Sequence, residues 1–176
     1  MKGYTIRKSQ PTDVGDIYSL YKNVAADNSG LARNDTEIDV AYVQGFTKKS
    51  QESGLQLVAV QDDGRIIGEM HGYSLLPAVF IHILSEVTIA IESTCQGQGI
   101  GRAILSAFLQ EVVQNRPDIY RIELIARASN VRAIRLYEQL GFHKEGRFEH
   151  RIKTTNGFEA DIPMAWFNPQ AKFGRE

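Results

Sequence analysis

Three glycines in five residues stand where a strand is expected to lead into a helix, in the segment Gln96-Gly97-Gln98-Gly99-Ile100-Gly101-Arg102. Glycine has no Cβ, so a ligand can come close to the backbone N–H groups there. The first N–H groups of a helix lack an internal acceptor, and the helix dipole makes that end positive. The segment therefore predicts a phosphate or pyrophosphate site with Arg102 at its rim. The alternative is a glycine-rich turn that only reverses the chain.

Two common phosphate-binding motifs fit this segment poorly. A dinucleotide-binding fold has G-x-G-x-x-G near the start of the chain, with an acidic residue at the end of the next strand. Here Arg102 occupies the third glycine position, and the next strand ends in Ile125-Ala126-Arg127. No Gly-Lys-Ser/Thr triplet of a P-loop follows either. The expected ligand is therefore a phosphate compound of another kind.

Glu86 is a carboxylate inside a predicted strand, Phe80–Ile91, whose other residues are mostly apolar. Such a group is costly to bury unless it is paired, hydrated or functional. We expect Glu86 to be partly buried beside Leu84, as a candidate general base that takes a proton through water. The alternative is a structural hydrogen bond to a neighbouring loop. Strict alternation divides the strand into two faces, with Val87, Ile89 and Ile91 on one and His82, Leu84, Glu86, Thr88 and Ala90 on the other.

Composition and charge exclude several classes of protein. The 176 residues are 43% hydrophobic and 23% charged, which is typical of a globular domain. The formal net charge of −1 gives no reason to expect a nucleic-acid partner. The single cysteine, Cys95, excludes an intramolecular disulfide and a multi-cysteine zinc site, so we expect no metal. No histidine lies near Cys95 in sequence, which favours a small apolar role over a covalent acyl-enzyme.

The sequence predicts neither a signal peptide nor a membrane span. Residues Met1–Arg7 contain no apolar stretch that could target the chain for secretion. The longest apolar run, Leu75–Leu84, is about half as long as the ~20 residues that a spanning helix needs. We therefore expect a cytoplasmic protein with no membrane partner.

Periodicity and turn signals predict an α/β fold in one domain, residues 1–176. The expected element order is β-α-α-β-β-β-α-β-α-β-β, with helices flanking a mixed, mostly antiparallel central sheet. Strands are expected at Tyr4–Arg7, Leu55–Gln61, Arg65–Tyr73, Phe80–Ile91, Arg121–Ala126, Phe142–Lys153 and Phe158–Phe167. Helices are expected at Thr12–Ala26, after a cap at Asp35, at Gly99–Gln114, and at Asn130–Leu140 with Asn130 as cap and Gly141 just beyond its end. Hairpins are expected at Asp62-Asp63-Gly64 and at Asn156-Gly157.

Two blocks of residues resemble those of the GNAT superfamily of N-acetyltransferases. Gln96, Gly99 and Gly101 match the family's fingerprint Gln/Arg-x-x-Gly-x-Gly/Ala, with glutamine as the less usual first residue. The segment Asn130…Ala133…Tyr137…Gly141-Phe142 is similar to the family's second conserved block. The resemblance covers nearly the whole chain, including the order of its strands.

The resemblance implies an acyl-CoA-dependent N-acyltransferase that moves an acetyl group from acetyl-CoA to a primary amine. The amine would attack directly, in a ternary complex. Tyr137 is implied to protonate the departing thiolate, and Glu86 matches a glutamate of amine-acetylating relatives. The alternative for Tyr137 is a core tyrosine at helical spacing with Ile134 and Leu140. The residues implied to bind coenzyme A are Ile89, Ala90 and Ile91 along the pantetheine arm, Gln96, Gly97, Gln98, Gly99, Ile100, Gly101 and Arg102 at the pyrophosphate, and Asn130, Ala133 and Tyr137 on the following helix.

The acceptor is expected to be a small-molecule or peptide amine, lined by loop 26–34 and the last hairpin. A homodimer is left open. Two other classes of function also remain: a non-catalytic acyl-CoA-binding sensor, and a partner-binding protein that uses its sheet edge. Tyr137 and Glu86 together argue against the sensor, which needs neither an acid nor a base.

Overall fold

The chain forms two compact units in a computed structural model that describes residues 3–27, 31 and 33–172. The first unit contains Met1–Tyr73 and Thr88–Glu111, and the second contains Ser74–Val87 and Val112–Glu176. Within loop 26–34, expected to line the acceptor side, residues 28–30 and 32 lie outside the described part of the chain. The expectation of a single domain stays a prediction.

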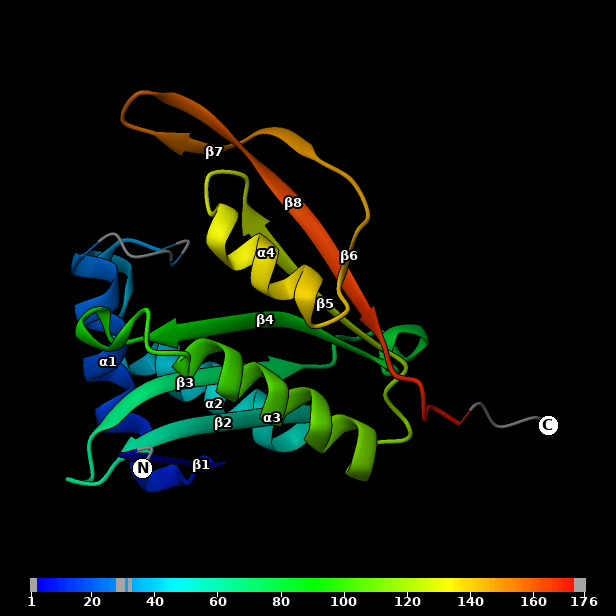
Figure 1. The fold of residues 1–176 in the computed structure, drawn as a ribbon, viewed down its shortest axis with the longest axis horizontal. Helices are drawn as coiled ribbons and strands as arrows, with labels where there is room; N and C mark the ends of the chain where they lie inside the picture. The colour runs from blue at the N-terminus through cyan, green and yellow to red at the C-terminus, as the bar shows by residue number, and fades with distance from the viewer. Residues whose placement is uncertain (1–2, 28–30, 32, 173–176) are drawn as a thin grey trace. The chain divides into compact units, whose positions relative to one another are not determined.

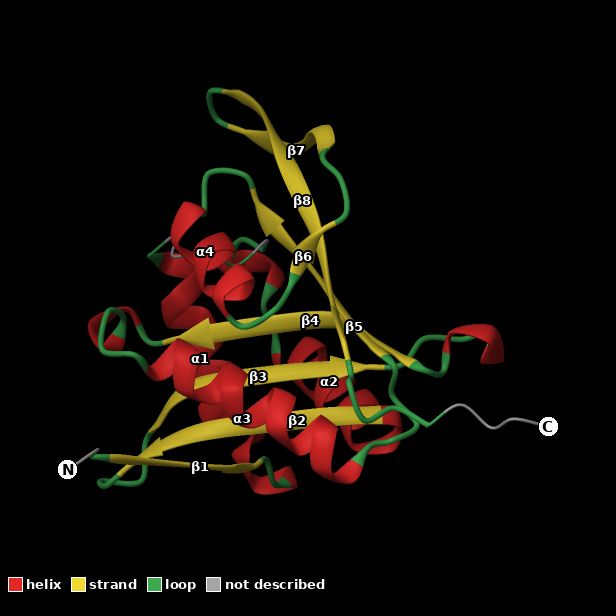
Figure 2. Ribbon diagram, turned by 45° about the vertical axis from the view of Figure 1, so that its right-hand side comes forward, coloured by secondary structure: helices red, strands yellow, loops and turns green. Residues whose placement is uncertain are grey.

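The first unit carries the antiparallel strands β1 (Tyr4–Lys8), β2 (Gly54–Gln61) and β3 (Ile66–Tyr73), shown in yellow in Figure 2. The predicted hairpin between β2 and β3 is confirmed. Gly64 has φ 90°, and its N–H donates to Gln61 O at 2.9 Å. Glycine adopts this left-handed conformation without the Cβ clash that other residues would suffer.

Helices cover both faces of these strands (Figures 1 and 2). α1 (Val14–Ala26) and α2 (Val40–Ser53) pack on one face. α3 (Ile100–Asn115) begins on the other face, where a Cβ on Gly68 of β3 would meet Ile91 Cδ1 at 2.9 Å and Ile100 Cγ2 at 3.4 Å. Glycine at this position therefore permits close packing under α3. The core on the α1–α2 face consists of Ile17, Leu20, Tyr21, Val24, Ala25, Ile38, Val43, Phe46, Val58, Ile66, Tyr73 and Ala90.

The second helix begins later than the sequence predicted. Asp39, and not Asp35, caps α2, because Asp39 Oδ1 accepts from Tyr42 N at 2.7 Å. Asp35–Glu37 forms a separate 3-10 turn, and Ile38 after it has an extended backbone. Aspartate is a good helix cap at position 35 and at position 39 alike. The extended backbone of Ile38 separates the 3-10 turn from the helix, so Asp39 becomes the cap.

The second unit is built around β8 (Gly157–Phe167). This strand pairs antiparallel with β5 (Arg121–Arg127), β6 (His143–Lys144) and β7 (Phe148–Thr154). Helix α4 (Val131–Gln139) connects β5 to β6. Figure 1 shows β7 and β8 as an orange hairpin.

Two details of this unit differ from the expected elements. The predicted strand Phe142–Lys153 is interrupted at residues 145–147, so β6 and β7 are separate strands. Both pair with β8, whose 11 residues are long enough to hold two partners. The hairpin turn falls on Thr155 and Asn156, and Gly157, with φ 129°, is already the first residue of β8.

Hydrogen-bonded strand neighbours follow the order β1-β2-β3-β4-β5-β8-β6, with β7 on β8. Strand β4 (Ile83–Ile91) starts later than expected, because Ala78–Phe80 forms a 3-10 turn. β4 and β5 are parallel at Ile83↔Arg121 and Leu84↔Ile122, whereas the pairs around β2 and β8 are antiparallel. The expected α/β class with a mixed, mostly antiparallel sheet is confirmed. Among the described helices, none combines the length and apolarity needed to cross a bilayer.

Candidate functional site

The glycine-rich segment connects β4 to α3 within the first unit, as predicted. Gly97 and Gly99 both have φ 84°, which residues with a Cβ rarely adopt. Ala103 N donates to Gly99 O at 3.0 Å, so the helical ladder starts here and the preceding N–H groups lie before it. A Cβ on Gly99 would meet no described atom within 4 Å. Gly97, Gln98 and Gly99 are exposed, so a ligand can reach the backbone of the loop, and a helix start of this kind suits an anion.

Two glutamine side chains of this loop hold the loop's own shape. Gln96 Nε2 donates to Ile91 O at 3.2 Å, which ties the loop back to the last residue of β4. Gln98 Nε2 donates to Thr94 O at 3.1 Å. The structure therefore uses the amide of Gln96, expected at the cofactor, to fix the turn that presents the glycines.

The backbone of Ile89, Ala90 and Ile91 forms the end of β4, as expected. Glu92 N donates to Ile67 O at 3.0 Å, so this end of β4 lies beside β3. The bond from Gln96 to Ile91 brings the strand end and the glycine loop together in one unit. These are the two backbone segments that the sequence assigned to one ligand.

Glu86 departs from the expected alternation. Its φ is 54°, a left-handed value that non-glycine residues rarely adopt. Leu84 and Ser85 are both buried, and Glu86 is exposed. The expected burial of Glu86 beside Leu84 is therefore wrong, because one left-handed residue changes which side chains face inward. Strained residues of this kind gather at functional sites, and a base at Glu86 stays a prediction.

An ionic network anchors the start of β4 to β5. Ser85 Oγ donates to Glu123 Oε1 at 2.7 Å, and Arg121 Nε donates to Glu123 Oε2 at 3.0 Å. Arg121 also donates to both carboxylate oxygens of Glu145. The hydrogen bonds to Glu145 and then Glu123 raise the already high pKa of Arg121 despite its partial burial. The network fixes β4 up to the residue before Glu86.

Helix α4 begins at Asn130, as predicted. Asn130 Oδ1 accepts from Ala133 N at 3.1 Å, so this oxygen serves as the helix cap. The side-chain amide of Asn130 can still donate to a ligand. Gly141 has the expected left-handed φ of 92°, and Phe142 N closes the helix by donating to Tyr137 O at 3.0 Å. The spacing places Asn130, Ala133 and Tyr137 along one side of α4.

Tyr137 has a half-buried side chain whose ring packs against Phe142, with centroids 5.8 Å apart. Burial raises the pKa of the Tyr137 phenol to about 12. The phenol therefore keeps its proton throughout the neutral range and can donate it. Glu86, Asn130, Ala133 and Tyr137 all belong to the second unit.

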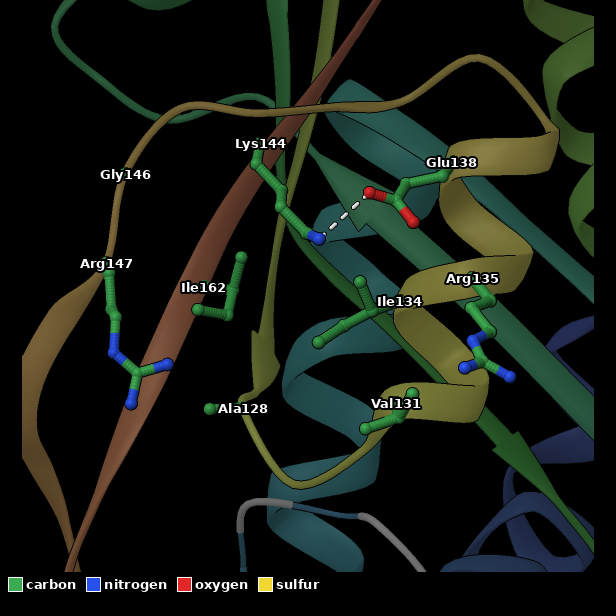
Figure 3. Close-up of a pocket in the computed structure, with 9 residues that line it drawn as sticks. All are labelled: Ala128, Val131, Ile134, Arg135, Glu138, Lys144, Gly146, Arg147 and Ile162. Atoms are coloured by element: carbon green, nitrogen blue, oxygen red, sulfur yellow. Dashed lines mark ion pairs between the residues drawn. The ribbon is translucent and has the colours of Figure 1, made fainter.

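A cavity of about 440 Å³ opens between α4 and the segment that joins β6 to β7 (Figure 3). Glu138 Oε1 and Lys144 Nζ are 2.9 Å apart there, and Figure 3 marks this ion pair. None of the site residues that the sequence predicted lines this cavity. Its lining residues are Ala128, Val131, Ile134, Arg135, Glu138, Lys144, Gly146, Arg147 and Ile162.

The model of the Acetyltransferase (GNAT) family matches residues 10–142, which include the glycine loop and α4. The chain belongs to the GNAT family. This confirms the resemblance seen in the sequence.

Parts of this chain are also similar to a curated protein and to solved structures. The ribosomal protein bS18-alanine N-acetyltransferase of Escherichia coli (strain K12) is 36% identical over 101 residues, which are 56% of this chain and 64% of that protein. A GNAT-family acetyltransferase from Streptococcus pneumoniae superposes with TM-score 0.84 at 21% identity, covering 93% of this chain and 99% of the other. A GNAT phosphinothricin acetyltransferase from Sinorhizobium meliloti, solved in complex with AcCoA, gives TM-score 0.83 at 17% identity, covering 97% and 91%. The two structures establish the shared fold.

Sequence reasoning missed a buried polar group in β3. Glu69 and His71 are 0% and 2% exposed, in a strand where every residue is buried. The signal was present, because two ionisable residues two positions apart in an apolar strand share one face. Their partners come from α1, α2 and β2, and no local pattern indicates them.

Proposed function

We propose that this chain is an acyl-CoA-dependent N-acetyltransferase that transfers an acetyl group from acetyl-CoA to a primary amine by direct attack. The observation that carries the proposal is the amide-lined loop between β4 and α3, with left-handed Gly97 and Gly99, in a chain of the GNAT family. The Escherichia coli relative is named for an alanine acceptor of a ribosomal protein, which supports an amine as the acceptor here.

The described residues fit acetyl-CoA, whose thioester supplies the acetyl group when it is bound. The amides of Gly97–Arg102 would hold its pyrophosphate at the positive end of α3. The backbone of Ile89–Ile91 would pair with its extended arm, as peptides pair with a sheet edge. Asn130 would donate from its side-chain amide, since its oxygen caps α4.

Tyr137 would supply the proton that the departing sulfur needs. Its raised pKa of about 12 keeps the phenol neutral, so the residue enters the reaction as an acid. Glu86 would accept a proton from the acceptor ammonium through water. Exposure of Glu86 gives water direct access to its carboxylate.

A thiol-release assay with acetyl-CoA tests the proposal. We expect turnover with at least one class of amine among alanine-start peptides, amino acids, polyamines and aminoglycosides. A thermal shift with acetyl-CoA, run in parallel, reports cofactor binding alone. Binding without turnover across all four classes would favour the sensor, and the absence of both would exclude the cofactor site.

Gly99→Ala should weaken acetyl-CoA binding at least tenfold, measured by calorimetry. The new Cβ would occupy the open space that the pyrophosphate must enter. Gly64→Ala is the matched control, because Gly64 has φ 90° and an equally open Cβ position in a hairpin turn. Both variants should lose about 1–2 kcal/mol of stability from left-handed strain. If the two variants bind acetyl-CoA with equal affinity, the glycine loop is not the cofactor site.

Tyr137→Phe should retain acetyl-CoA binding and lower kcat by about 10²-fold or more, as expected for loss of a general acid. Because the pKa of Tyr137 is about 12, wild-type activity should show no alkaline loss from this group below about pH 11. Tyr18→Phe, at another half-buried phenol, is the control. Wild-type kcat in the Tyr137 variant would make this side chain a packing residue.

Glu86→Gln should lower turnover most at pH 6–7, where an amine acceptor is mostly protonated. Turnover should partly recover at higher pH as free amine accumulates. A pH–rate profile measures this, with circular dichroism to verify folding and Glu149→Gln, at an exposed strand carboxylate, as control. Superimposable profiles would make Glu86 structural.

A further inference from the structure

Acetylation of a protonated amine releases two protons from one nitrogen. The nitrogen has three N–H bonds as a primary ammonium and one N–H bond in the amide. One proton equivalent ends on the sulfur of the thiol product, and the other passes to solvent. Tyr137 gives one proton to the sulfur and regains one from solvent, so both protons that leave the nitrogen can pass to acceptors beside the amine. Glu86 accounts for one of these acceptors, and the other remains to be assigned.

We propose that Thr88, His71 and Glu69 form a proton relay, leading inward from β4, that accepts one of these two protons. The proposal rests on the proposed function, because it concerns the same amine acetylation. All three residues belong to the first unit. Thr88 is the outer member, and His71 and Glu69 are positioning residues that act through its hydroxyl.

Glu69 is held by donors from two further elements. Tyr21 OH of α1 donates to Glu69 Oε2 at 2.7 Å, and Gln56 Nε2 of β2 donates to Oε1 at 2.8 Å. Ser9 Oγ donates to Gln56 Oε1 at 2.6 Å, which fixes the orientation of the amide. These hydrogen bonds satisfy both oxygens of a side chain that is 0% exposed.

His71 presents one ring nitrogen to this carboxylate. Its Nδ1 is 3.1 Å from Glu69 Oε1 and 3.2 Å from Oε2. Tyr21 OH is also 3.3 Å from Nδ1. An ionised carboxylate can only accept, so we assign the hydrogen to Nδ1 and the lone pair of a neutral imidazole to Nε2. Phe46 stacks on the imidazole at 4.0 Å and 8°, which fixes the ring plane. A carboxylate that orients an imidazole in this way prepares Nε2 to take a proton.

The other ionisable groups around the imidazole leave this arrangement intact. Burial, followed by the charge of Glu69, raises the pKa of Tyr21 well above its usual value, so Tyr21 remains a donor. Tyr42 of α2 contacts Tyr21, with ring centroids 6.3 Å apart. Tyr73 of β3 stacks beside His71, with ring centroids 6.2 Å apart. Lys49 of α2 lies over the Tyr73 ring, with Nζ 5.2 Å from the centroid of that ring.

The register of β3 and β4 places Thr88 next to His71. The bond from Glu92 N to Ile67 O and the approach of Ile91 to Gly68 define an antiparallel register at this end of β4. Two residues along each strand from the Glu92–Ile67 pair, Ala90 lies opposite Glu69. Two residues further, on the same face, Thr88 lies opposite His71. Cross-strand partners on one face have Cβ atoms about 4.5–5.5 Å apart, within reach of a hydroxyl–imidazole hydrogen bond. Thr88 is half-buried, so it is the member nearest to solvent.

The proton moves without another reactant. An N–H bond of the amine breaks as the Thr88 hydroxyl takes that proton and passes its own to His71 Nε2. The imidazolium is then stabilised by Glu69, whose charge it balances. After acetylation the proton returns along the same path to water. The net transfer is one proton from the amine nitrogen to solvent.

Thr88→Val is the central test, because valine keeps the shape and the β-branch and removes only the hydroxyl. We expect kcat with acetyl-CoA and the fastest amine of the panel to fall at least tenfold at pH 6–7, with the acid limb of the pH–rate profile displaced. Thr5→Val, at an exposed threonine of β1, is the matched control. His71→Asn keeps a donor to Glu69 and removes the base, so it should give the same displaced limb. A Thr88 variant with the wild-type kcat and profile would overturn the relay.

A second measurement uses the wild-type protein and needs no variant to fold. Long-range proton–nitrogen NMR of the histidine rings should show His71 with hydrogen on Nδ1 and none on Nε2 near neutral pH. Hydrogen on Nε2 near neutral pH, with or without hydrogen on Nδ1, would overturn the relay. Absence of wild-type turnover in the amine panel would instead contradict the proposed function, and leaves the NMR result to decide the state of His71.

Discussion

The buried carboxylate of Glu69 joins three elements of the first unit. Its hydrogen-bond partners come from α1, β2 and β3, through Tyr21, Gln56 and His71. Removing one donor from a buried polar group costs about 1–3 kcal/mol, and more when the group is charged. Each of these hydrogen bonds also fixes the distance and direction between the two groups that it joins. The α1 layer is thereby fixed over β3, and with it the face on which Ala90 of β4 is buried.

Hydrogen bonds hold strand β4 on either side of one left-handed residue. Before Glu86, the hydrogen bond of Ser85 to Glu123 ties the strand to β5. After it, the bond of Glu92 to Ile67 ties the strand to β3. A non-glycine residue with φ 54° costs about 1–3 kcal/mol and persists only where its flanks are fixed. The anchors on both sides explain how β4 keeps this strain, and why Glu86 is exposed within a strand.

Features encoded by neighbouring residues could be predicted from the sequence, and features that need distant partners could not. The glycine loop, the Asn130 cap and the Gly141 helix end each depend on a few adjacent residues, and all three have the expected geometry. The prediction that Glu86 is partly buried was wrong, because alternation assumes an extended backbone at every position. The Glu69 network escaped notice because Tyr21 is 48 positions away and Gln56 is 13. The predicted start of α2 was wrong, because Asp35 and Asp39 are equally good caps in sequence until the backbone between them is known.

The two groups that would handle protons lie in different surroundings. The ring of Tyr137 packs against Phe142, and burial of the phenol raises its pKa to about 12 and keeps it protonated. Glu69 is buried more completely, and Tyr21 and Gln56 donate hydrogen bonds to its two oxygens. Burial without donors favours the neutral form of an acid, whereas donors to its oxygens favour the charged form. The proposed acid on α4 and the proposed acceptors on β3 would therefore differ in which elements supply N–H and O–H donors, and not in depth of burial alone.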